Sequence, residues 1–370
     1  MKILEICPYS AGVCGVWTRV FSEARLLKKA GHEVYVFSSD IEKGSNKKVP
    51  DKDEWEGVKI RRFPVKLSVG ENAHFWNFKK EFAELKPDIV IVHVYRHPHT
   101  NQGLDLAKKH GAKCYLVTHA PFVEKGLRSK KLELGVKLYD LMFKKNFSKY
   151  DKVIAITYWE KPYLLELRCP EEKIVYIPNG IPDEFFKEQV KKFRGKKVLF
   201  LGRIAPIKNL EVLIKAISEI KDINLDIVGP AEEDYLEELK ELVKKLDAKN
   251  INFNDPVYDL KKKIKKIQEA DVFVLPSKRE AMPQALIETM ALGKIVIASK
   301  TKGAVDIIKN GKNGFLFELD DYKDLKSKLE YVLDKNNIKI IEKIQKDTRK
   351  FAERFKWSIL IKDLEKIIDG

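Results

Sequence analysis

Residues 276–293 read Pro276-Ser-Lys-Arg-Glu280-Ala-Met-Pro-Gln-Ala-Leu-Ile-Glu288-Thr-Met-Ala-Leu-Gly293 and follow a short apolar run over 272–275. The apolar run predicts a buried strand, Pro283 favours the first position of a helix, and Gly293 favours a helix end. This order places Glu280 in a loop and Glu288 one to two turns inside the helix. Because parallel strands end at one edge of their sheet, both carboxylates are expected at a ligand-binding edge.

The same alternation of strand-sized apolar runs and helix-period segments runs through the chain in two series. Strands are predicted at 2–7, 33–38, 58–63, 88–94, 113–119, 152–157 and 174–177, and again at 197–201, 225–228, 251–253, 272–275, 295–298 and 315–317. Such alternation favours parallel sheets covered by helices on both faces. We therefore expect an α/β protein with two facing, doubly wound Rossmann-like domains, 1–181 and 197–352, a linker over 182–196, and a cleft between the domains.

Length and composition exclude several classes of protein to which the chain could otherwise belong. A chain of 370 residues is long enough for two domains, and its net charge of +16 suggests an anionic partner. No apolar run approaches the roughly 18–20 residues that span a bilayer, and the N-terminus does not resemble a signal peptide. The cysteines form no CxxC pair, which argues against a zinc ribbon. We expect a cytoplasmic protein.

Two segments of the second half carry groups suited to a phosphate. Backbone N–H groups of Met282, Gln284 and Ala285, at the start of the predicted helix, favour an anion. Arg203 and Lys208 follow the first strand of this half, where a planar guanidinium and an ammonium suit a departing diphosphate. The alternative is that Glu280, Glu288 and these two cations are solvated charges on the protein surface.

The first half offers a glycine-containing loop and a group of histidines. The loop over 9–17 includes Gly15 and suits either phosphate binding or a tight turn. His119 ends a predicted strand, where it suits a hydrogen bond to a sugar hydroxyl or a place in the core. The remaining histidines of interest, His93, His97 and His99, allow a metal site as one interpretation, although further ligands are not evident.

Taken in order, these motifs resemble the retaining nucleotide-sugar glycosyltransferases of the GT-B fold, specifically glycosyltransferase family 4, over nearly the whole chain. The most specific is the pair of glutamates, Glu280 and Glu288, separated by seven residues in 276–293. The others are Gly202-Arg203 with Lys208, Ile177-Pro-Asn179-Gly180, Gly31-His32, Thr118-His119, Asn313-Gly314 and Phe355-Lys-Trp357-Ser. The resemblance implies that a C-terminal helix, 353–370, crosses back to the N-terminal domain.

The resemblance also implies roles for the site residues. The C-terminal domain would bind a UDP-, GDP- or ADP-linked sugar, and the N-terminal domain would bind the acceptor. Four residues would form the catalytic set: Glu280, His119, Arg203 and Lys208. The donor would be contacted by Gly15, Arg203, Lys208, Val257, Met282, Pro283, Gln284, Ala285 and Glu288.

Within that set, the resemblance implies that Glu280 and His119 contact the sugar, Glu288 the ribose, and Arg203 and Lys208 the diphosphate. The base would lie near Val257. The sugar would be transferred with retention of its anomeric configuration and without a metal or cofactor, the leaving diphosphate acting as base. Synthesis of glycans, glycolipids or cell-surface polysaccharides is the expected setting.

Two other functions remain open from the residues. A nucleotide-sugar epimerase or a glycoside phosphorylase would share the fold, and a basic chain can bind nucleic acid. The positive charge is scattered in runs such as 261–266 and accompanies no nucleic-acid-binding motif. We therefore expect no nucleic acid as partner.

The segment Glu124–Tyr150 has eight Lys or Arg against three acidic residues, together with apolar residues at helical spacing. A basic amphipathic helix of this kind suits an anionic membrane surface, where a lipid-linked acceptor would be reached; a saccharide acceptor is the other expectation. Localisation would then be peripheral, on the inner face of the cell membrane. The alternative is that the apolar stripe packs on the sheet and the lysines are solvated.

Overall fold

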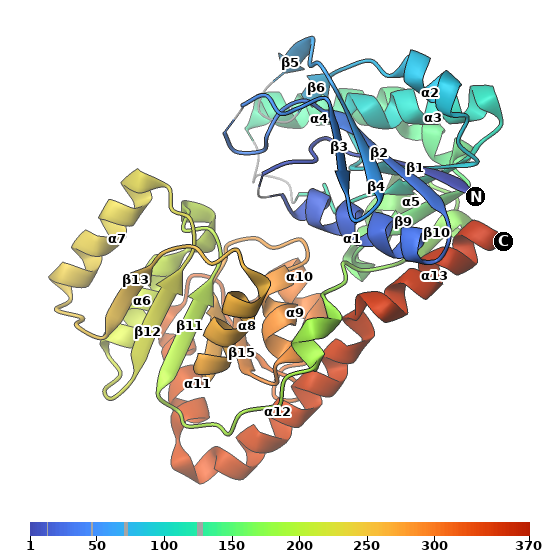
Figure 1. Ribbon diagram of the computed structural model, residues 1–370. Helices are drawn as coiled ribbons and strands as arrows, with labels where there is room; N and C mark the ends of the chain where they lie inside the picture. The colour runs from blue at the N-terminus through green and yellow to red at the C-terminus, as the bar shows by residue number, and fades with distance from the viewer. Residues whose placement is uncertain (13, 46, 70–72, 124–128) are drawn as a thin grey trace. The chain divides into compact units, whose positions relative to one another are not determined.

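The computed structural model describes residues 1–12, 14–45, 47–69, 73–123 and 129–370 (Figure 1). The chain divides into two compact units. The first contains Met1–Gly180 together with Trp357–Gly370, and the second contains Ile181–Lys356. Both are α/β units with mainly parallel sheets, as the alternation of strands and helices predicts.

The first unit is built on a sheet with the order β10-β9-β8-β7-β1-β2-β4-β3, in which only β3 is antiparallel to its neighbour. Its strands are β1 (Lys2–Ile6), β2 (Glu33–Ser39), β3 (Lys52–Trp55), β4 (Val58–Phe63), β7 (Ile89–His93), β8 (Lys113–Val117), β9 (Lys152–Ala155) and β10 (Ile174–Tyr176). A small hairpin, β5 (Leu67–Val69) with β6 (Ala73–Phe75), stands apart from this sheet.

Helices cover both faces of this sheet (Figure 1). They are α1 (Gly15–Lys29), α2 (Lys79–Leu85), α3 (Pro98–His110), α4 (Lys130–Phe143), α5 (Lys161–Glu166) and the C-terminal α13 (Trp357–Asp369). Helix α13 packs beside α1, and α2 packs beside α3. Strand β7 is buried along its whole length because it lies in the middle of a sheet covered on both sides.

The second unit has a wholly parallel sheet with the order β13-β12-β11-β14-β15-β16. Its strands are β11 (Lys197–Leu201), β12 (Asn224–Val228), β13 (Ile251–Asn254), β14 (Val272–Leu275), β15 (Ile295–Ser299) and β16 (Phe315–Phe317). Its helices are α6 (Leu210–Ser218), α7 (Glu233–Lys245), α8 (Leu260–Glu269), α9 (Gln284–Ala291), α10 (Lys302–Ile307), α11 (Tyr322–Leu333) and α12 (Ile338–Ala352).

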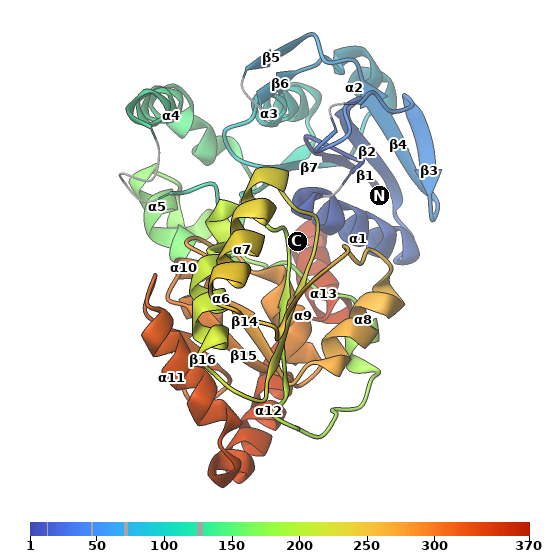
Figure 2. The ribbon, with the colours of Figure 1, turned by 90° about the vertical axis from the view of Figure 1, so that its left-hand side faces the viewer.

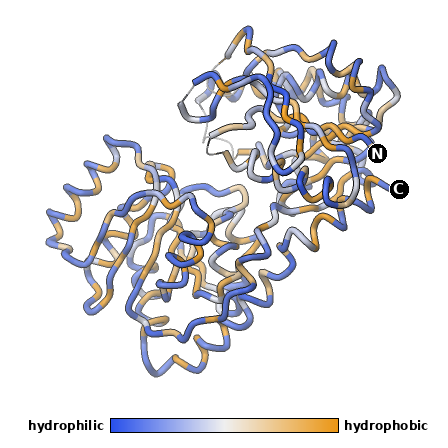
Figure 3. Tube along the Cα trace, viewed as in Figure 1, coloured by the Kyte–Doolittle hydropathy of each residue, from blue (hydrophilic) through white to orange (hydrophobic). Residues whose placement is uncertain are grey.

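Hydropathy along the trace follows these layers within each unit, since the central strands are mostly hydrophobic while hydrophilic residues recur along the helices (Figure 3). In β14 every residue is buried, and so is every residue of β15. Helix α6 contacts α7 and α11, and α9 contacts α12. The apolar runs read from the sequence are therefore the buried centres of the two sheets.

Residues 182–196, for which the sequence predicts a linker, belong to the second unit. Phe185 is fully buried and Phe193 nearly so. The carboxylate of Asp271 accepts hydrogen bonds from the backbone N–H groups of Arg194, Lys196 and Lys197. These contacts hold the segment against the edge of the second sheet at which β11 and β14 begin.

The return of the chain to the first unit begins at Trp357, whereas residues 353–356 belong to the second unit. Trp357 is buried, and a Cβ atom on Gly180 would lie 2.4 Å from its ring. Only glycine therefore allows the indole to pack there. Gly180, in the Ile177–Gly180 segment, thus has a packing reason.

Candidate active site

The predicted donor-binding residues of the second unit lie at the carboxyl edge of its sheet. Arg203 and Lys208 follow β11, Val257 follows β13, and residues 276–283 follow β14. The β11 and β14 loops are joined by a backbone hydrogen bond from Lys278 N–H to the Ile207 carbonyl, 2.9 Å long. The sheet therefore brings the predicted groups to one edge, as parallel topology requires.

Lys208 and Glu280 are the most closely coupled of these side chains. Lys208 ends a short 3₁₀ turn (Pro206–Lys208), and its Nζ lies 2.6 Å from Glu280 Oε1. The same oxygen accepts a 2.6 Å hydrogen bond from the hydroxyl of Ser277. Both charged side chains are mostly buried but keep some exposure, 21% and 12%. An ammonium and a carboxylate are thus held together at a position that a ligand can reach.

Helix α9 follows the predicted course. Pro283 is its N-cap, the helix covers Gln284–Ala291, and Gly293 has a left-handed φ of +66°. Glu288 lies inside the helix and is 5% exposed. Burial raises the pKa of its carboxyl group, and the nearby Lys263 opposes that rise. Lys263 Nζ lies 2.6 Å from Glu288 Oε2.

Residues at the end of β15 and the start of α10 pack closely against residues 277–281. Gly303, in α10, donates a hydrogen bond from its N–H to the carbonyl of Glu280 at 3.2 Å. A Cβ atom on Gly303 would lie 2.4 Å from the carbonyl oxygen of Ala281. Ser299 donates to the carbonyl of Ser277 at 2.5 Å. The loop that carries Glu280 is therefore held by Ser299, at the end of β15, and by Gly303, in α10.

The other predicted donor contacts differ in their exposure to solvent. Arg203 lies 61% exposed and pairs with Glu232 at 3.0 Å, while Val257 is half-buried in the loop before α8. Met282 and Pro283 are buried, and Gln284 and Ala285 are half-buried at the first turn of α9. Asp321 caps α11 by accepting from the N–H groups of Lys323 and Asp324.

In the first unit, His119 follows β8 and adopts a left-handed backbone, with φ +58°; Ala120 follows with φ +49°. Two consecutive non-glycine residues in this region are strained, so other contacts must hold them. Glu160 supplies those contacts. One carboxylate oxygen accepts from Ala120 N–H (3.0 Å) and from the Thr118 hydroxyl, and the other accepts from Ile156 N–H (2.8 Å).

Gly15 is the first residue of α1, and a Cβ atom there would meet no atom of the described residues within 4 Å. Nothing in the packing of this unit therefore requires glycine at that position. Gly12 differs, since φ is +80° and a Cβ would lie 2.4 Å from the Lys43 carbonyl oxygen. In the loop over 9–17, Val13 lies outside the described residues.

The histidines do not converge on one point. His93 Nδ1 lies 3.0 Å from His119 Nε2, and His93 Nε2 lies 3.0 Å from Glu5 Oε2. His99 instead donates from Nε2 to the His93 carbonyl at 2.9 Å, and the His97 ring lies beside the His99 ring, tilted by 51°, with centroids 5.4 Å apart. Burial lowers the pKa of His97 to about 4 and of His99 to about 3.

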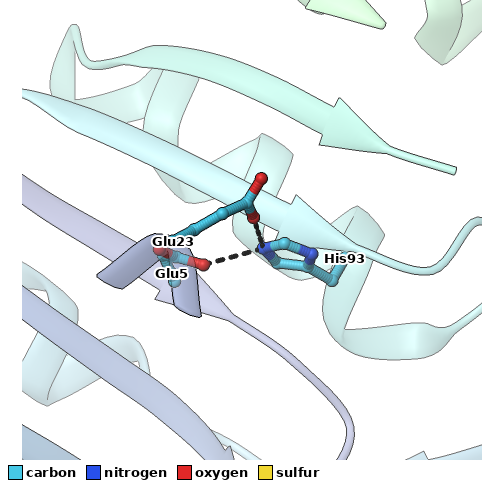
Figure 4. Close-up of side chains that lie close together, drawn as sticks. All are labelled: Glu5, Glu23 and His93. Atoms are coloured by element: carbon cyan, nitrogen blue, oxygen red, sulfur yellow. Dashed lines mark hydrogen bonds and ion pairs between the residues drawn. The ribbon is translucent and has the colours of Figure 1, made fainter. Parts of the chain in front are cut away.

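Glu5, Glu23 and His93 offer ligand atoms that all lie within 4.8 Å of one another, and all three side chains are buried (Figure 4). Figure 4 shows both carboxyl groups directed at the same ring nitrogen. Arg19 Nη2 lies 2.8 Å from Glu23 Oε1 and already supplies a positive charge. The chemistry of this set therefore fits a hydrogen-bonded charge cluster better than a cation site.

Three residues that contact the predicted site residues or their neighbours in the chain were not themselves predicted from the sequence. Glu160 had a readable signal, because Thr157-Tyr-Trp-Glu160 is a capping box, and the structure forms it. Glu5 is an acidic residue within an apolar strand run, which also marks an unusual position. Lys263 had no signal, since it is one of several lysines in the run 261–266.

Helix α4 presents an apolar surface to solvent; the first residues of the predicted basic segment, 124–128, lie outside the described residues. No residue of α4 is buried, and five large apolar side chains are between 52% and 66% exposed: Leu132, Leu134, Leu138, Leu141 and Met142. The helix contacts the rest of the unit through Tyr139, which accepts from Asn101 at 2.6 Å, and Asp140, which pairs with Arg96 at 2.7 Å.

Figure 2 shows α4 end-on at the outer margin of the first unit. The alternative that its whole apolar stripe packs on the sheet is therefore wrong for these five side chains. Among the described residues, no helix combines the length and hydropathy needed to cross a membrane.

Comparison with known proteins decides the family. The model for "Glycosyltransferase Family 4" matches residues 13–185, and the model for "Glycosyl transferases group 1" matches residues 182–353. The chain belongs to glycosyltransferase family 4. It is a GT-B glycosyltransferase, and the family match confirms the resemblance read from the glutamate segment.

Relatives of this glycosyltransferase span nearly its whole length. An uncharacterised glycosyltransferase of Methanocaldococcus jannaschii is 27% identical, covering 93% of this chain and 91% of the relative. The phosphatidyl-myo-inositol mannosyltransferase of Mycolicibacterium smegmatis is 26% identical, covering 100% of this chain and 94% of that protein. The relatives thus include an enzyme whose name contains phosphatidyl-myo-inositol, a phospholipid.

Solved structures agree on the fold of this glycosyltransferase. HepE of Anabaena, solved in complex with UDP, is 16% identical with a TM-score of 0.80 and covers 100% of both chains. Sucrose-phosphate synthase from Thermosynechococcus elongatus is 17% identical with a TM-score of 0.77, covering 100% of this chain and 98% of that one. At these identities the likeness concerns the fold.

Proposed function

We propose that this glycosyltransferase moves a sugar from a nucleoside-diphosphate sugar to an acceptor hydroxyl with retention of anomeric configuration. The observation that carries the proposal is the Lys208–Glu280 pair, Nζ to Oε1 2.6 Å, beside the start of α9. An ammonium suits the diphosphate, and a carboxylate suits the hydroxyl groups of the sugar. The complex of HepE with UDP supports a nucleotide donor for this fold.

The second unit would bind the donor through the groups at its carboxyl edge. Glu288 would accept hydrogen bonds from the ribose hydroxyls, and the loop around Val257 would contact the base. Arg203 and Lys208 would neutralise the diphosphate, aided by backbone N–H groups at the first turn of α9. In the first unit, His119 would donate to the sugar, and Gly15 would let the backbone approach the donor.

The transfer requires no reactant other than the donor and the acceptor. The acceptor oxygen forms a bond to the anomeric carbon while the bond from that carbon to the diphosphate oxygen breaks. The leaving nucleoside diphosphate takes the electron pair, and its oxygen receives the hydroxyl proton on the same face of the sugar. Arg203 and Lys208 stabilise the charge that develops on the diphosphate, and no step uses a metal or cofactor.

A panel of UDP-, GDP- and ADP-sugars tests donor binding directly. A ligand that binds the folded state at 100 times its Kd stabilises that state by about 2.7 kcal/mol, which raises the thermal midpoint. We expect one nucleotide class to raise the midpoint of the wild type and to raise that of Glu288→Gln less. Equal midpoints with every nucleotide sugar, at concentrations up to several millimolar, would contradict the proposal.

We further propose that α4 rests on an anionic membrane surface and brings a lipid-linked acceptor within reach. Exposed apolar side chains along the helix would enter the interface, and the flanking cations would meet anionic headgroups, each adding about 1 kcal/mol. The cations that serve are Lys130, Lys131, Lys137, Lys144 and Lys145. The mannosyltransferase relative, named for a phosphatidylinositol, supports a lipid acceptor.

Flotation with phosphatidylglycerol vesicles tests this surface. The wild type should float at low salt and less at high salt, and the variant with Lys130, Lys131, Lys144 and Lys145 changed to Gln should stay in the pellet fraction. A matched control changes four exposed lysines of the second unit, Lys249, Lys261, Lys262 and Lys265, to Gln. Equal flotation of both variants would contradict a role for α4 and leave a soluble saccharide acceptor as the better choice.

A further inference from the structure

A buried chain of hydrogen bonds leads from the sheet to the predicted sugar contact. Glu5 lies in β1, His93 ends β7, and His119 follows β8. Glu5 Oε2 lies 3.0 Å from His93 Nε2, and His93 Nδ1 lies 3.0 Å from His119 Nε2. Glu5 and His93 are fully buried, whereas His119 is partly exposed. The chain therefore connects a closed interior to a ring that a ligand can reach.

The direction of these hydrogen bonds follows from the charges around them. Arg19 pairs with Glu23 at 2.8 Å, so one cation balances one carboxylate. An ionised Glu5 would leave a second, unbalanced negative charge in the interior. Its other oxygen, Oε1, has no hydrogen-bond partner among the described residues, which would make the ionised form costlier still.

The other groups around Glu5, His93 and His119 also favour the uncharged form of all three side chains. Burial and the Glu23 carboxylate raise the pKa of Glu5 well above its ordinary value, and Arg19 opposes them. Burial lowers the pKa of His93 and of His119 well below 6.5. From α3, His99 donates only to the His93 carbonyl and does not compete for either ring nitrogen of His93.

We propose that Glu5 and His93 are positioning residues that fix the tautomer of His119. A protonated Glu5 donates to His93 Nε2, so His93 carries its proton on Nδ1 and donates to His119 Nε2. His119 must then carry its own proton on Nδ1, which makes that nitrogen a hydrogen-bond donor for a ligand. The proposal rests on the proposed function only in taking the sugar as that ligand.

Nitrogen-15 NMR of histidine-labelled protein tests the tautomers without any substrate. His119 and His93 are assigned from the signals that are lost in His119→Gln and His93→Phe. We expect both rings in the wild type to carry the proton on Nδ1 and to stay neutral between about pH 5.5 and 8. A proton on Nε2 of His119, or titration of either ring with an ordinary pKa, would overturn the proposal.

Variants separate positioning from general stability. In His93→Phe, His119 should lose its single tautomer, and transfer should fall roughly 5- to 30-fold, as one lost hydrogen bond implies. Glu5→Gln can still donate to His93 and should keep the wild-type tautomer and rate, whereas Glu5→Leu should lose both. His99→Gln, a buried control that keeps its donor, should leave the His119 tautomer unchanged.

Two different experimental outcomes would separate an error in the role of Glu5 and His93 from an error in the proposed sugar transfer. If no donor supports transfer while His119 carries its proton on Nδ1, the positioning chain stands and the sugar is the wrong ligand. If transfer proceeds while Glu5→Leu retains both tautomer and rate, the chain is structural only, and the proposal is wrong.

Discussion

Lys208 and Glu280 are 72 residues apart in the chain, yet Lys208 Nζ lies 2.6 Å from Glu280 Oε1. The first residue follows β11 and the second follows β14, two neighbouring strands. The proposed roles give the ammonium to the diphosphate and the carboxylate to the sugar. Their contact would therefore mark the junction where the bond between sugar and phosphate breaks.

Replacing each glutamate by glutamine should separate the two roles. Glu280→Gln should keep nucleotide affinity but lose most of the transfer rate, since it contacts the sugar. Glu288→Gln should weaken donor binding, because a ribose would lose a charge-assisted acceptor. Isothermal titration with nucleotide and a transfer assay measure the two effects. Wild-type turnover by Glu280→Gln would contradict the assignment.

Arg203→Ala and Lys208→Ala should each remove a charge-assisted contact worth about 1.5–3 kcal/mol, equivalent to roughly tenfold to 150-fold in affinity or rate. Comparing a nucleoside monophosphate with the nucleotide sugar isolates the contact to the diphosphate. Lys249→Ala is the control, since its side chain is 86% exposed and lies before β13, at the opposite edge. Equal losses for both ligands would argue against a diphosphate contact.

Gly180→Ala should destabilise the docking of the C-terminal helix. Its Cβ would lie 2.4 Å from the Trp357 ring, and overpacking of a core costs about 1–3 kcal/mol. Gly135→Ala in α4 is the matched control, because its Cβ meets nothing within 4 Å and alanine favours a helix. Urea unfolding followed by tryptophan fluorescence compares the two. A wild-type midpoint for Gly180→Ala would show that α13 packs differently.

His99 should make stability fall in mild acid. Its pKa is lowered from 6.5 to about 3 by burial, so below pH 6.5 the unfolded chain binds a proton that the folded chain does not. The contribution is fully present above pH 6.5 and declines as pH falls towards 3. At pH 5 the loss is about 2 kcal/mol.

The measurement is the difference in free energy of unfolding between the wild type and His99→Gln at pH 7.5 and pH 5. This difference cancels contributions of opposite sign from Glu5 and Glu23, whose pKa values are raised. The wild type should lose about 2 kcal/mol relative to the variant over this range. A difference that does not change with pH would mean that His99 titrates normally.

The sheets and the course of α9 were predictable because the signals are local. Pro283 and Gly293 mark the two ends of the helix, and buried parallel strands read as continuous apolar runs. The hairpin β5–β6 was missed because its strands have three residues each, and most of these residues are exposed. Strands so short produce no alternation that a pattern can detect.

The partners within the site depend on contacts distant in sequence. The edge on which Glu280 and Lys208 lie follows from topology, but the pairing of Glu288, in α9, with Lys263, in α8, depends on where the two helices lie in the folded unit. Glu5 and His93 are 88 residues apart and meet because β1 and β7 are neighbours. Sequence order alone does not give such pairs, since they arise from the order of strands in the sheet.

If the sugar leaves the nucleoside diphosphate with retention, real-time proton NMR of the donor panel, with and without EDTA, will detect the anomer that is released first. In the absence of acceptor, slow hydrolysis of one donor should release nucleoside diphosphate and, first, the free sugar in the donor's own anomeric configuration, at the same rate with or without EDTA. Glu280→Gln should release far less. Release of the opposite anomer first, or activity lost in EDTA and restored by a divalent metal, would contradict the account.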